Sequence, residues 1–124
     1  MTNNNELPAI VLLPWPPRTL SPNARVHWGK KSKAAKIYRI CCMALTLESG
    51  VRAPEGRVLL SVEFCPPDRR RRDDDNCLAS FKAGRDGIAD ALRIDDSRFV
   101  TTISMGEPVK GGAVRVRLAG EARA

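Results

Sequence analysis

Hydrophobic residues recur along the chain at two spacings, one typical of strands and one typical of helices. Alternating apolar and polar positions, or short apolar runs, predict strands over residues 10–13, 57–65, 98–105 and 113–118. Apolar residues three and four positions apart predict helices over residues 30–48 and 76–92. The expected order is β-α-β-α-β-β. One mixed sheet with two main helices packed on it, an α/β protein of the α+β type, is the simplest way to bury these faces.

Prolines mark the borders of the first two strands. The run Pro14-Trp15-Pro16-Pro17 ends one and Pro66-Pro67 ends the other, because proline cannot donate to a sheet ladder. We expect residues 1–8 to form a flexible lead, residues 9–118 a single domain and residues 119–124 a flexible tail. The length of 124 residues fits one domain.

The composition is that of a basic globular protein. Lys and Arg number 21 against 14 Asp and Glu, so the formal net charge is +7. Such an excess favours a polyanionic partner. No apolar run approaches the ~20 residues that span a bilayer, and the first residues lack the pattern of a secretion signal. A cytoplasmic location without a membrane partner is therefore expected.

Cysteine use agrees with a reducing compartment. The four cysteines are Cys41, Cys42, Cys65 and Cys77. No two of them form a C-x-x-C pair, and the single His27 cannot complete a zinc set. We expect reduced and mostly buried thiols. His27, in a loop, is more typical of a structural or exposed residue than of a catalytic base.

The most unusual segment is 68–76, in which four arginines stand directly before three aspartates and Asn76. A second acidic pair, Asp95-Asp96, follows the second predicted helix. The two acidic groups meet only if the strand over 98–105 begins where the strand over 57–65 ends, and an antiparallel pairing would achieve this. Clustered carboxylates repel one another unless a cation lies between them, and Mg²⁺ prefers such oxygen ligands. Arginines beside that site would hold phosphates.

Each part of this segment also has a plainer interpretation. A solvated charge run explains Arg69 to Arg72, helix capping explains Asp73 to Asp75, and a turn explains Asp95-Asp96. A calcium loop is excluded, because the sixth and twelfth positions counted from the first aspartate are Leu78 and Gly84 rather than Gly and Glu.

Taken together, these segments resemble the RusA family of Holliday-junction resolvases, small endonucleases common in prophages. The likeness covers residues 10–118. It rests on three motifs, namely Leu13-Pro14-Trp15-Pro16-Pro17 followed by Asn23, the run from Pro67 to Asn76 with its D-x-D-N element, and Leu92-x-x-Asp95-Asp96. The combination of a basic run, D-x-D-N and a downstream D-D is specific, whereas a single piece is not.

The resemblance implies a homodimer that binds four-way DNA junctions and introduces paired nicks with Mg²⁺, for which Mn²⁺ substitutes. Such an enzyme would act in recombination and repair, in the cytoplasm of a bacterium or on phage DNA there. The resemblance assigns Asp73, Asp75 and Asp96 as catalytic metal ligands. The family's catalytic lysine corresponds to Ala79, so we assign that role to Lys82, three residues further along the helix.

Contacts to DNA are assigned to basic residues and one amide: Arg69, Arg70, Arg71, Arg72, Asn76, Lys30, Lys31 and Lys33. No small-molecule cofactor is expected. The choice of Asp96 over Asp95 stays open. So do three other functions: a non-catalytic DNA-binding module, an Mg²⁺ nuclease for flaps or forks, and an RNA-binding protein. The aromatic content of 5% argues against recognition of single strands by base stacking.

Overall fold

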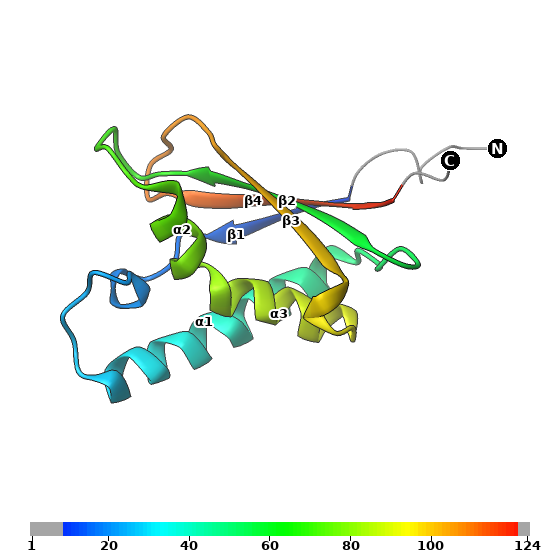
Figure 1. Ribbon diagram of the computed structural model, residues 1–124, viewed down its shortest axis with the longest axis horizontal. Helices are drawn as coiled ribbons and strands as arrows, with labels where there is room; N and C mark the ends of the chain where they lie inside the picture. The colour runs from blue at the N-terminus through cyan, green and yellow to red at the C-terminus, as the bar shows by residue number, and fades with distance from the viewer. Residues whose placement is uncertain (1–8, 122–124) are drawn as a thin grey trace.

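The computed structural model describes residues 9–121, which form an α+β fold with one mixed sheet and helices packed on it (Figure 1). Its main elements are β1 (Ala9–Pro14), α1 (Trp28–Ser49), β2 (Val58–Cys65), α2 (Asp74–Ser80), α3 (Lys82–Leu92), β3 (Phe99–Met105) and β4 (Ala113–Gly120). Two short 3₁₀ turns, η2 (Arg18–Leu20) and η3 (Asp96–Arg98), precede α1 and β3. The predicted fold class is confirmed, and each predicted strand lies within two residues of its expected bounds.

The strand order in the sheet is β1-β4-β2-β3. β4 runs antiparallel to both of its neighbours, whereas β2 and β3 run parallel, with Val58 beside Phe99 and Phe64 beside Met105. The expected antiparallel pairing of β2 and β3 is therefore wrong. The helical segment between these two strands carries the chain back to the starting end of β2, as a crossover connection does, so β3 runs in the same direction.

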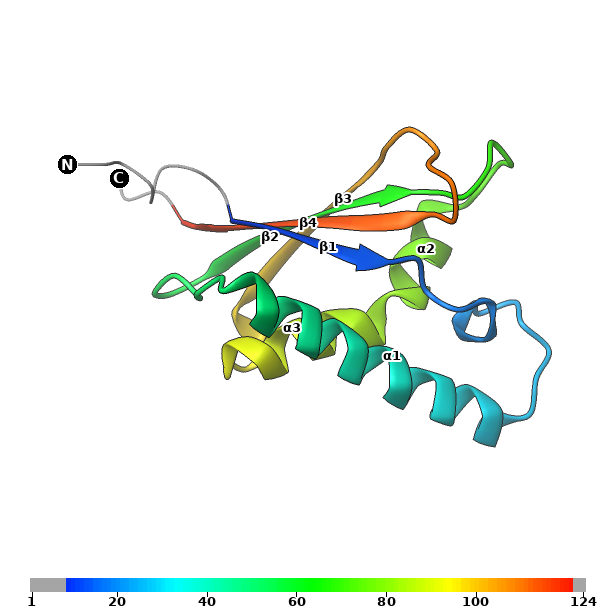
Figure 2. The same cartoon turned by 180° about the vertical axis from the view of Figure 1, so that it is seen from behind.

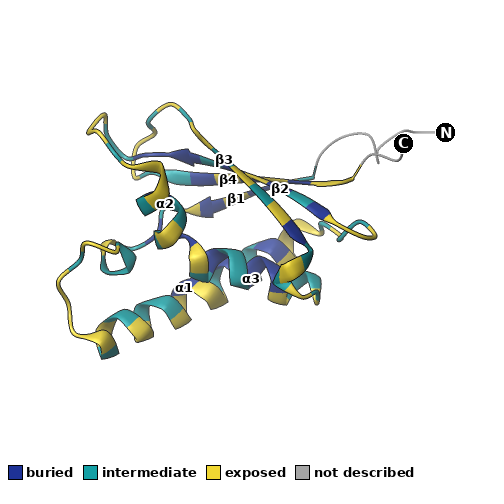
Figure 3. Cartoon of the chain, viewed as in Figure 1, coloured by how far each residue is buried: buried dark blue, intermediate teal, exposed yellow. Residues whose placement is uncertain are grey.

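One face of the sheet is buried by helices and the other is open. The three α-helices of residues 9–121 lie on the same side of the sheet in Figures 1 and 2. Along β2 and β4, buried residues alternate with more exposed ones, as the sequence pattern predicts (Figure 3). The core joins these strand residues to buried side chains of the helical layer, among them Tyr38, Cys42, Phe81 and Ile88.

The predicted helix over 76–92 is in fact two helices. The first begins earlier, at Asp74, and a break at Phe81 separates α2 from α3. The Phe81 ring is fully buried, edge-on to Phe64 at 5.9 Å and to Tyr38 at 6.3 Å between ring centroids. Turning the chain here lets this ring enter the core while α3 lies along α1. The hydrophobic stripe continues through the break, so periodicity could not reveal it.

Small residues let α3 approach α1 closely. At Gly87 a Cβ would collide with the backbone carbonyl oxygen of Arg39, and at Gly84 it would lie 2.8 Å from the Tyr38 ring. Across the same contact, Arg39 donates two hydrogen bonds to Asp90, with Nε–Oδ2 at 2.7 Å and Nη2–Oδ1 at 2.9 Å. The helix pair is therefore held by close packing and by an ion pair at its solvent edge.

The remaining expectations concern the ends of the chain and the thiols. All four cysteines are free, three of them buried and one half-buried, as predicted. β4 continues to Gly120, so the first two residues of the expected tail over 119–124 belong to a strand. The expected lead over residues 1–8, and residues 122–124, lie outside the described residues. Between residues 9 and 121, no helix is long and apolar enough to cross a membrane.

Candidate nucleic-acid interface

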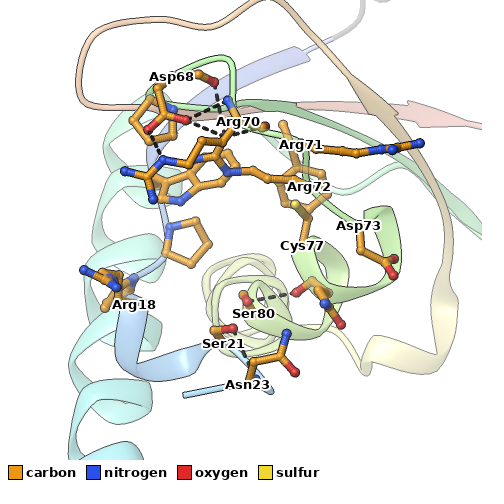
Figure 4. A pocket seen from close by; sticks show the side chains of 16 residues that line it. Arg18, Ser21, Asn23, Asp68, Arg70, Arg71, Arg72, Asp73, Cys77 and Ser80 are labelled. Carbon is orange, nitrogen blue, oxygen red and sulfur yellow. Dashed lines mark hydrogen bonds and ion pairs between the residues drawn. The ribbon is translucent and has the colours of Figure 1, made fainter. Parts of the chain in front are cut away.

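An open cleft of about 420 Å³ lies between the segment that follows β1 and the loop that joins β2 to α2 (Figure 4). We call it the arginine cleft, because Arg18, Arg70, Arg71 and Arg72 line it. Asp73 lines it too, and Figure 4 shows Arg18 across the cavity from Arg71 and Asp73. The cleft therefore brings cations together with a carboxylate at the start of α2.

The position of this cleft follows from where two strands end. Pro14 is the last residue of β1, and Pro66-Pro67 directly follow β2. Both strands end beside Ala113 of β4, so both segments leave the sheet at the same end. Between them, the Trp15 ring packs edge-on against Phe64 of β2, with 6.1 Å between ring centroids. This contact forms the floor on which the charged side chains are arranged.

Arg72 holds the loop between β2 and α2 in shape. Its Nη1 lies 2.9 Å from Asp68 Oδ1 and donates to the carbonyl oxygens of Asp68, at 3.1 Å, and Arg70, at 3.0 Å. The guanidinium carbon lies 5.7 Å from the centroid of the Trp15 ring. The hydrogen bond from Arg72, and then that from the Arg70 backbone N–H, lowers the pKa of Asp68. The charge of Arg72 is thus largely compensated within the loop.

The neighbouring arginines face solvent instead. The Arg70 side chain is 82% exposed, with its Nε 3.6 Å from Asp68 Oδ2. Arg69 and Arg71 are also exposed, and neither forms an ion pair with any residue between 9 and 121. A phosphate could bind to the guanidinium groups of Arg69 and Arg71 without displacing a carboxylate.

The aspartates begin α2. Asp73 caps the helix, with its Oδ1 accepting a hydrogen bond from the backbone N–H of Asp75 at 2.8 Å. Asp74 and Asp75 lie exposed in the first turn, where the helix dipole favours negative charge. The capping interpretation is therefore confirmed for Asp73. Its Oδ2 and both carboxylate oxygens of Asp75 accept no hydrogen bond from residues 9–121. Asn76, the next residue, also lines the arginine cleft.

Asp96 lies apart from these residues. The parallel register puts it beside the start of β2, whereas Asp73 comes after the end of that strand. Its Oδ2 is 3.5 Å from Nη1 of Arg85 in α3. In the part of the chain that the structure describes, no three His, Cys, Asp or Glu side chains form a group that could hold a metal ion. One chain therefore does not gather Asp73, Asp75 and Asp96.

Two further candidates make local contacts. Asp95, the alternative to Asp96, caps η3 by accepting from the backbone N–H of Ser97 at 3.0 Å, and hydrogen bonds from Ser97 lower its pKa. Lys82 begins α3, where its Nζ lies 3.3 Å from Asp86 Oδ2. Lys82 lines a neighbouring groove rather than the arginine cleft.

The lysines of α1 surround the start of that helix. Lys30, Lys31 and Lys33 occupy its first two turns, and Figures 1 and 2 show this part of α1 extending past the sheet. Lys31 lines the same groove as Lys82. The basic residues assigned to DNA thus fall into two neighbouring surfaces, one around the arginine cleft and one at the start of α1.

The donor set fits Mg²⁺ in part. Mg²⁺ is commonly held by one or two carboxylates together with water and substrate phosphates. Asp73 offers such oxygens beside the arginines of the cleft, whereas Asp75 lies in the first turn of α2 and does not line the cleft. These two carboxylates therefore fit an ion that is shared with a nucleic acid only as far as their number and type. Asp96 does not join them within one chain.

Two residues at these surfaces were not singled out from the sequence. Arg18 directly follows the prolines that end β1, and this neighbourhood could have indicated its place in the cleft. Trp28, the first residue of α1, is 75% exposed. No spacing of residues around Trp28 distinguishes an exposed tryptophan from a buried one.

Comparison with known proteins identifies a bacterial relative. No protein-family model matches the chain. The chain is 49% identical over 113 residues to an uncharacterized protein of Xylella fastidiosa (strain Temecula1), an alignment that covers 87% of this chain and 74% of the relative. The chain therefore belongs to the same family as this bacterial protein.

Proposed function

We propose that the chain is an Mg²⁺-dependent endonuclease that resolves four-way DNA junctions by paired nicks. The observation that carries this proposal is the arginine cleft, where exposed arginines lie beside Asp73, the cap of α2. Mg²⁺-assisted phosphodiester hydrolysis uses cations that bind phosphate next to oxygen ligands for the metal ion. The motifs that resemble the RusA family support the same choice. The relative supports a bacterial setting, and action on DNA there would take place in the cytoplasm.

Binding of the DNA backbone would fall to the exposed cations. The exposed Arg69, Arg70 and Arg71 are proposed to contact phosphates. Arg72 keeps their loop in the shape that presents them. Asn76 lines the same cleft and can donate an amide hydrogen bond to a phosphate oxygen. These contacts read charge and shape rather than base sequence.

Chemistry would fall to the aspartates. Asp73 and Asp75 are the residues proposed to hold Mg²⁺, which when bound supplies a Lewis acid and an activated water. The cap that Asp73 makes fixes its carboxylate relative to the first turn of α2. Lys82 is proposed to neutralise charge on the phosphate. To do so, its ammonium group would leave Asp86 and bind a phosphate oxygen instead.

A non-catalytic DNA-binding module is the second candidate. One observation favours it, namely that no three acidic, histidine or cysteine side chains of residues 9–121 gather into a metal group. In such a module the basic surfaces would bind DNA in the same way. The aspartates would then serve only to cap α2 and complement its dipole.

The deciding experiment is cleavage of a labelled four-way junction beside linear duplex, flap and fork substrates. We expect cutting of the junction alone, abolished by EDTA and restored by Mg²⁺ or Mn²⁺. Asp75→Asn should lower cleavage on the order of 100-fold or more while junction binding persists. Asp74→Asn is the matched control, because it removes the same charge from the same helical turn without removing a proposed ligand.

Other results would change the assignment. Junction binding without any cutting by the unmodified chain would favour the binding module. Preferential cutting of flaps or forks would assign another branched substrate. Equal loss of cleavage in Asp74→Asn and Asp75→Asn would mean that both substitutions act through the lost negative charge. Asp75 would then have no special role as a metal ligand.

A further inference from the structure

Trp28 is displayed to solvent in a way that the other aromatic residues are not. Its side chain is 75% exposed at the start of α1. The other five aromatic residues, Trp15, Tyr38, Phe64, Phe81 and Phe99, are buried or half-buried. A large aromatic ring left in water forgoes the stabilisation that burial would bring, and it offers a flat apolar face to a binding partner.

The Trp28 ring is also held in place. The neighbouring His27 ring lies nearly parallel to it, with 6.0 Å between ring centroids and 27° between ring planes. His27 is itself fixed as the cap of α1, its Nδ1 accepting a hydrogen bond from the backbone N–H of Gly29 at 3.1 Å. The His27 ring is therefore an offset neighbour of the tryptophan, and most of the Trp28 side chain stays open to solvent.

The charges around Trp28 select the kind of partner. Arg25 and Lys30 are exposed beside it in the sequence, and Lys31 and Lys33 follow within two turns of the helix. The first turn of α1 holds no acidic residue. An apolar ring within such a basic surface fits a polyanion that carries flat, stackable groups, which is the chemistry of a nucleic acid.

A groove connects this surface to the arginine cleft. It measures about 420 Å³ and runs between α1 and the junction of α2 with α3, with Trp28, Lys31 and Lys82 in its lining. Ser80 lines both this groove and the arginine cleft, so the two are adjacent. A strand bound in the arginine cleft could follow the groove to reach Trp28.

We infer that Trp28 stacks on an exposed base face of bound DNA, in a single strand or at a branch point, with Lys30 and Lys31 on the adjacent phosphates. The inference rests on the proposed function in taking DNA as the partner. A base inside continuous duplex is already stacked on both sides, whereas single strands and branch points offer free faces. Trp28 would thus contribute selectivity for branched or single-stranded DNA. The low overall aromatic content argued against base stacking because it does not show that one of the few aromatic rings is exposed.

The test is a comparison of binding by the full chain to a single strand, a four-way junction and a linear duplex, measured by fluorescence anisotropy. Trp28→Ala should weaken single-strand and junction binding by about 5- to 150-fold, the range of one base stack, and leave duplex binding unchanged. Trp28→Phe should retain most of the affinity. Ile37→Ala is the matched control, because it truncates another exposed side chain, 59% exposed, further along α1.

A spectroscopic readout isolates stacking from charge. A single strand that carries 2-aminopurine should lose fluorescence on binding the unmodified chain and keep it on binding Trp28→Ala. Equal loss of affinity for all three DNAs would overturn the inference. So would light scattering that shows Trp28→Ala dissociating an oligomer, since Trp28 would then be a protein contact.

The inference and the proposed function fail in different ways. Trp28-dependent binding without any Asp75-dependent cleavage would refute the nuclease and leave stacking in place. Cleavage together with unchanged binding by Trp28→Ala would refute stacking alone.

Discussion

Arg71 and Arg72 are neighbours in the chain with opposite surroundings. Arg71 is exposed and makes no ion pair with residues 9–121, whereas Arg72 lies over Trp15 and is bonded to Asp68. In this run of four arginines, Arg72 therefore stabilises the loop, whereas the other three side chains are exposed on it. Sequence alone treats these positions as equivalent.

These surroundings predict different effects for the two arginines. Arg71→Ala should weaken DNA binding and reduce the slope of log affinity against log salt by about 0.9, without changing stability. Arg72→Ala should lower both affinity and the urea midpoint of unfolding, because Asp68 and two carbonyl oxygens lose their donor. Salt titrations and urea denaturation measure these effects. An unchanged midpoint for Arg72→Ala would contradict the structural role.

At the scale of elements, the close approach of α1 and α3 depends on Gly87. A Cβ there would collide with the Arg39 carbonyl oxygen, and backbone cannot move aside as a flexible side chain can. We expect Gly87→Ala to destabilise the fold by about 1–3 kcal/mol, measured by urea unfolding. Gly29→Ala, whose Cβ would meet only the His27 ring at 3.2 Å, should have a smaller effect. Equal effects would argue against tight helix packing.

The ion pair between the same helices predicts a dependence on pH. Hydrogen bonds from Arg39 lower the pKa of Asp90 below its ordinary 3.8. The contribution of this pair to stability is therefore present above that value and is lost as the pH falls through the lower pKa of the folded protein. Asp90→Asn should be less stable than the unmodified chain at pH 7, and the difference should shrink in acid below pH 3.8.

Thermal unfolding across this range of pH measures the difference. Glu48→Gln is the control, because Glu48 lies on α1 without an ion pair to residues 9–121. A difference between Asp90→Asn and the unmodified chain that persists undiminished in acid would contradict the role of the ion pair.

Periodicity predicted the elements well and their connections less well. Alternation in 57–65 and 113–118 reflects burial on one face of a sheet, and the structure places strands there. The direction of β3 depends instead on how α2 and α3 return the chain, which no local pattern encodes. For the site, the arginine–aspartate segment was found because its charges are unusual. The separation of Asp96 from Asp73 follows from the direction of β3. The sequence could not predict it, because no local pattern encodes that direction.

At the scale of the whole molecule, the position of Asp96 bears on assembly. The resemblance assigns it to the same metal site as Asp73 and Asp75, and the described chain does not bring it there. Both statements hold together only if a second copy of the chain supplies Asp96. We therefore expect two inactive variants, Asp75→Asn and Asp96→Asn, to regain cleavage when they are refolded together.

Complementation arises because such a mixed dimer contains one site with all its carboxylates intact. A site built within one chain would remain defective in both copies. Single-strand nicking of the junction by the mixture, compared with each variant alone, is the measurement. Full activity of Asp96→Asn by itself would remove Asp96 from the site.

The place of β4 in the sheet has a consequence for synthesis. This strand lies between β1 and β2, and β1 pairs with no other strand of residues 9–121. Ala9 cannot pair with Leu118 until that residue has been synthesised. β1 therefore leaves the ribosome long before its partner strand is made. During that interval Val11 and Leu13, which are buried in the finished fold, stay exposed. Such a long-range closure is slow, and the nascent chain is at its most prone to aggregation until its final strand emerges.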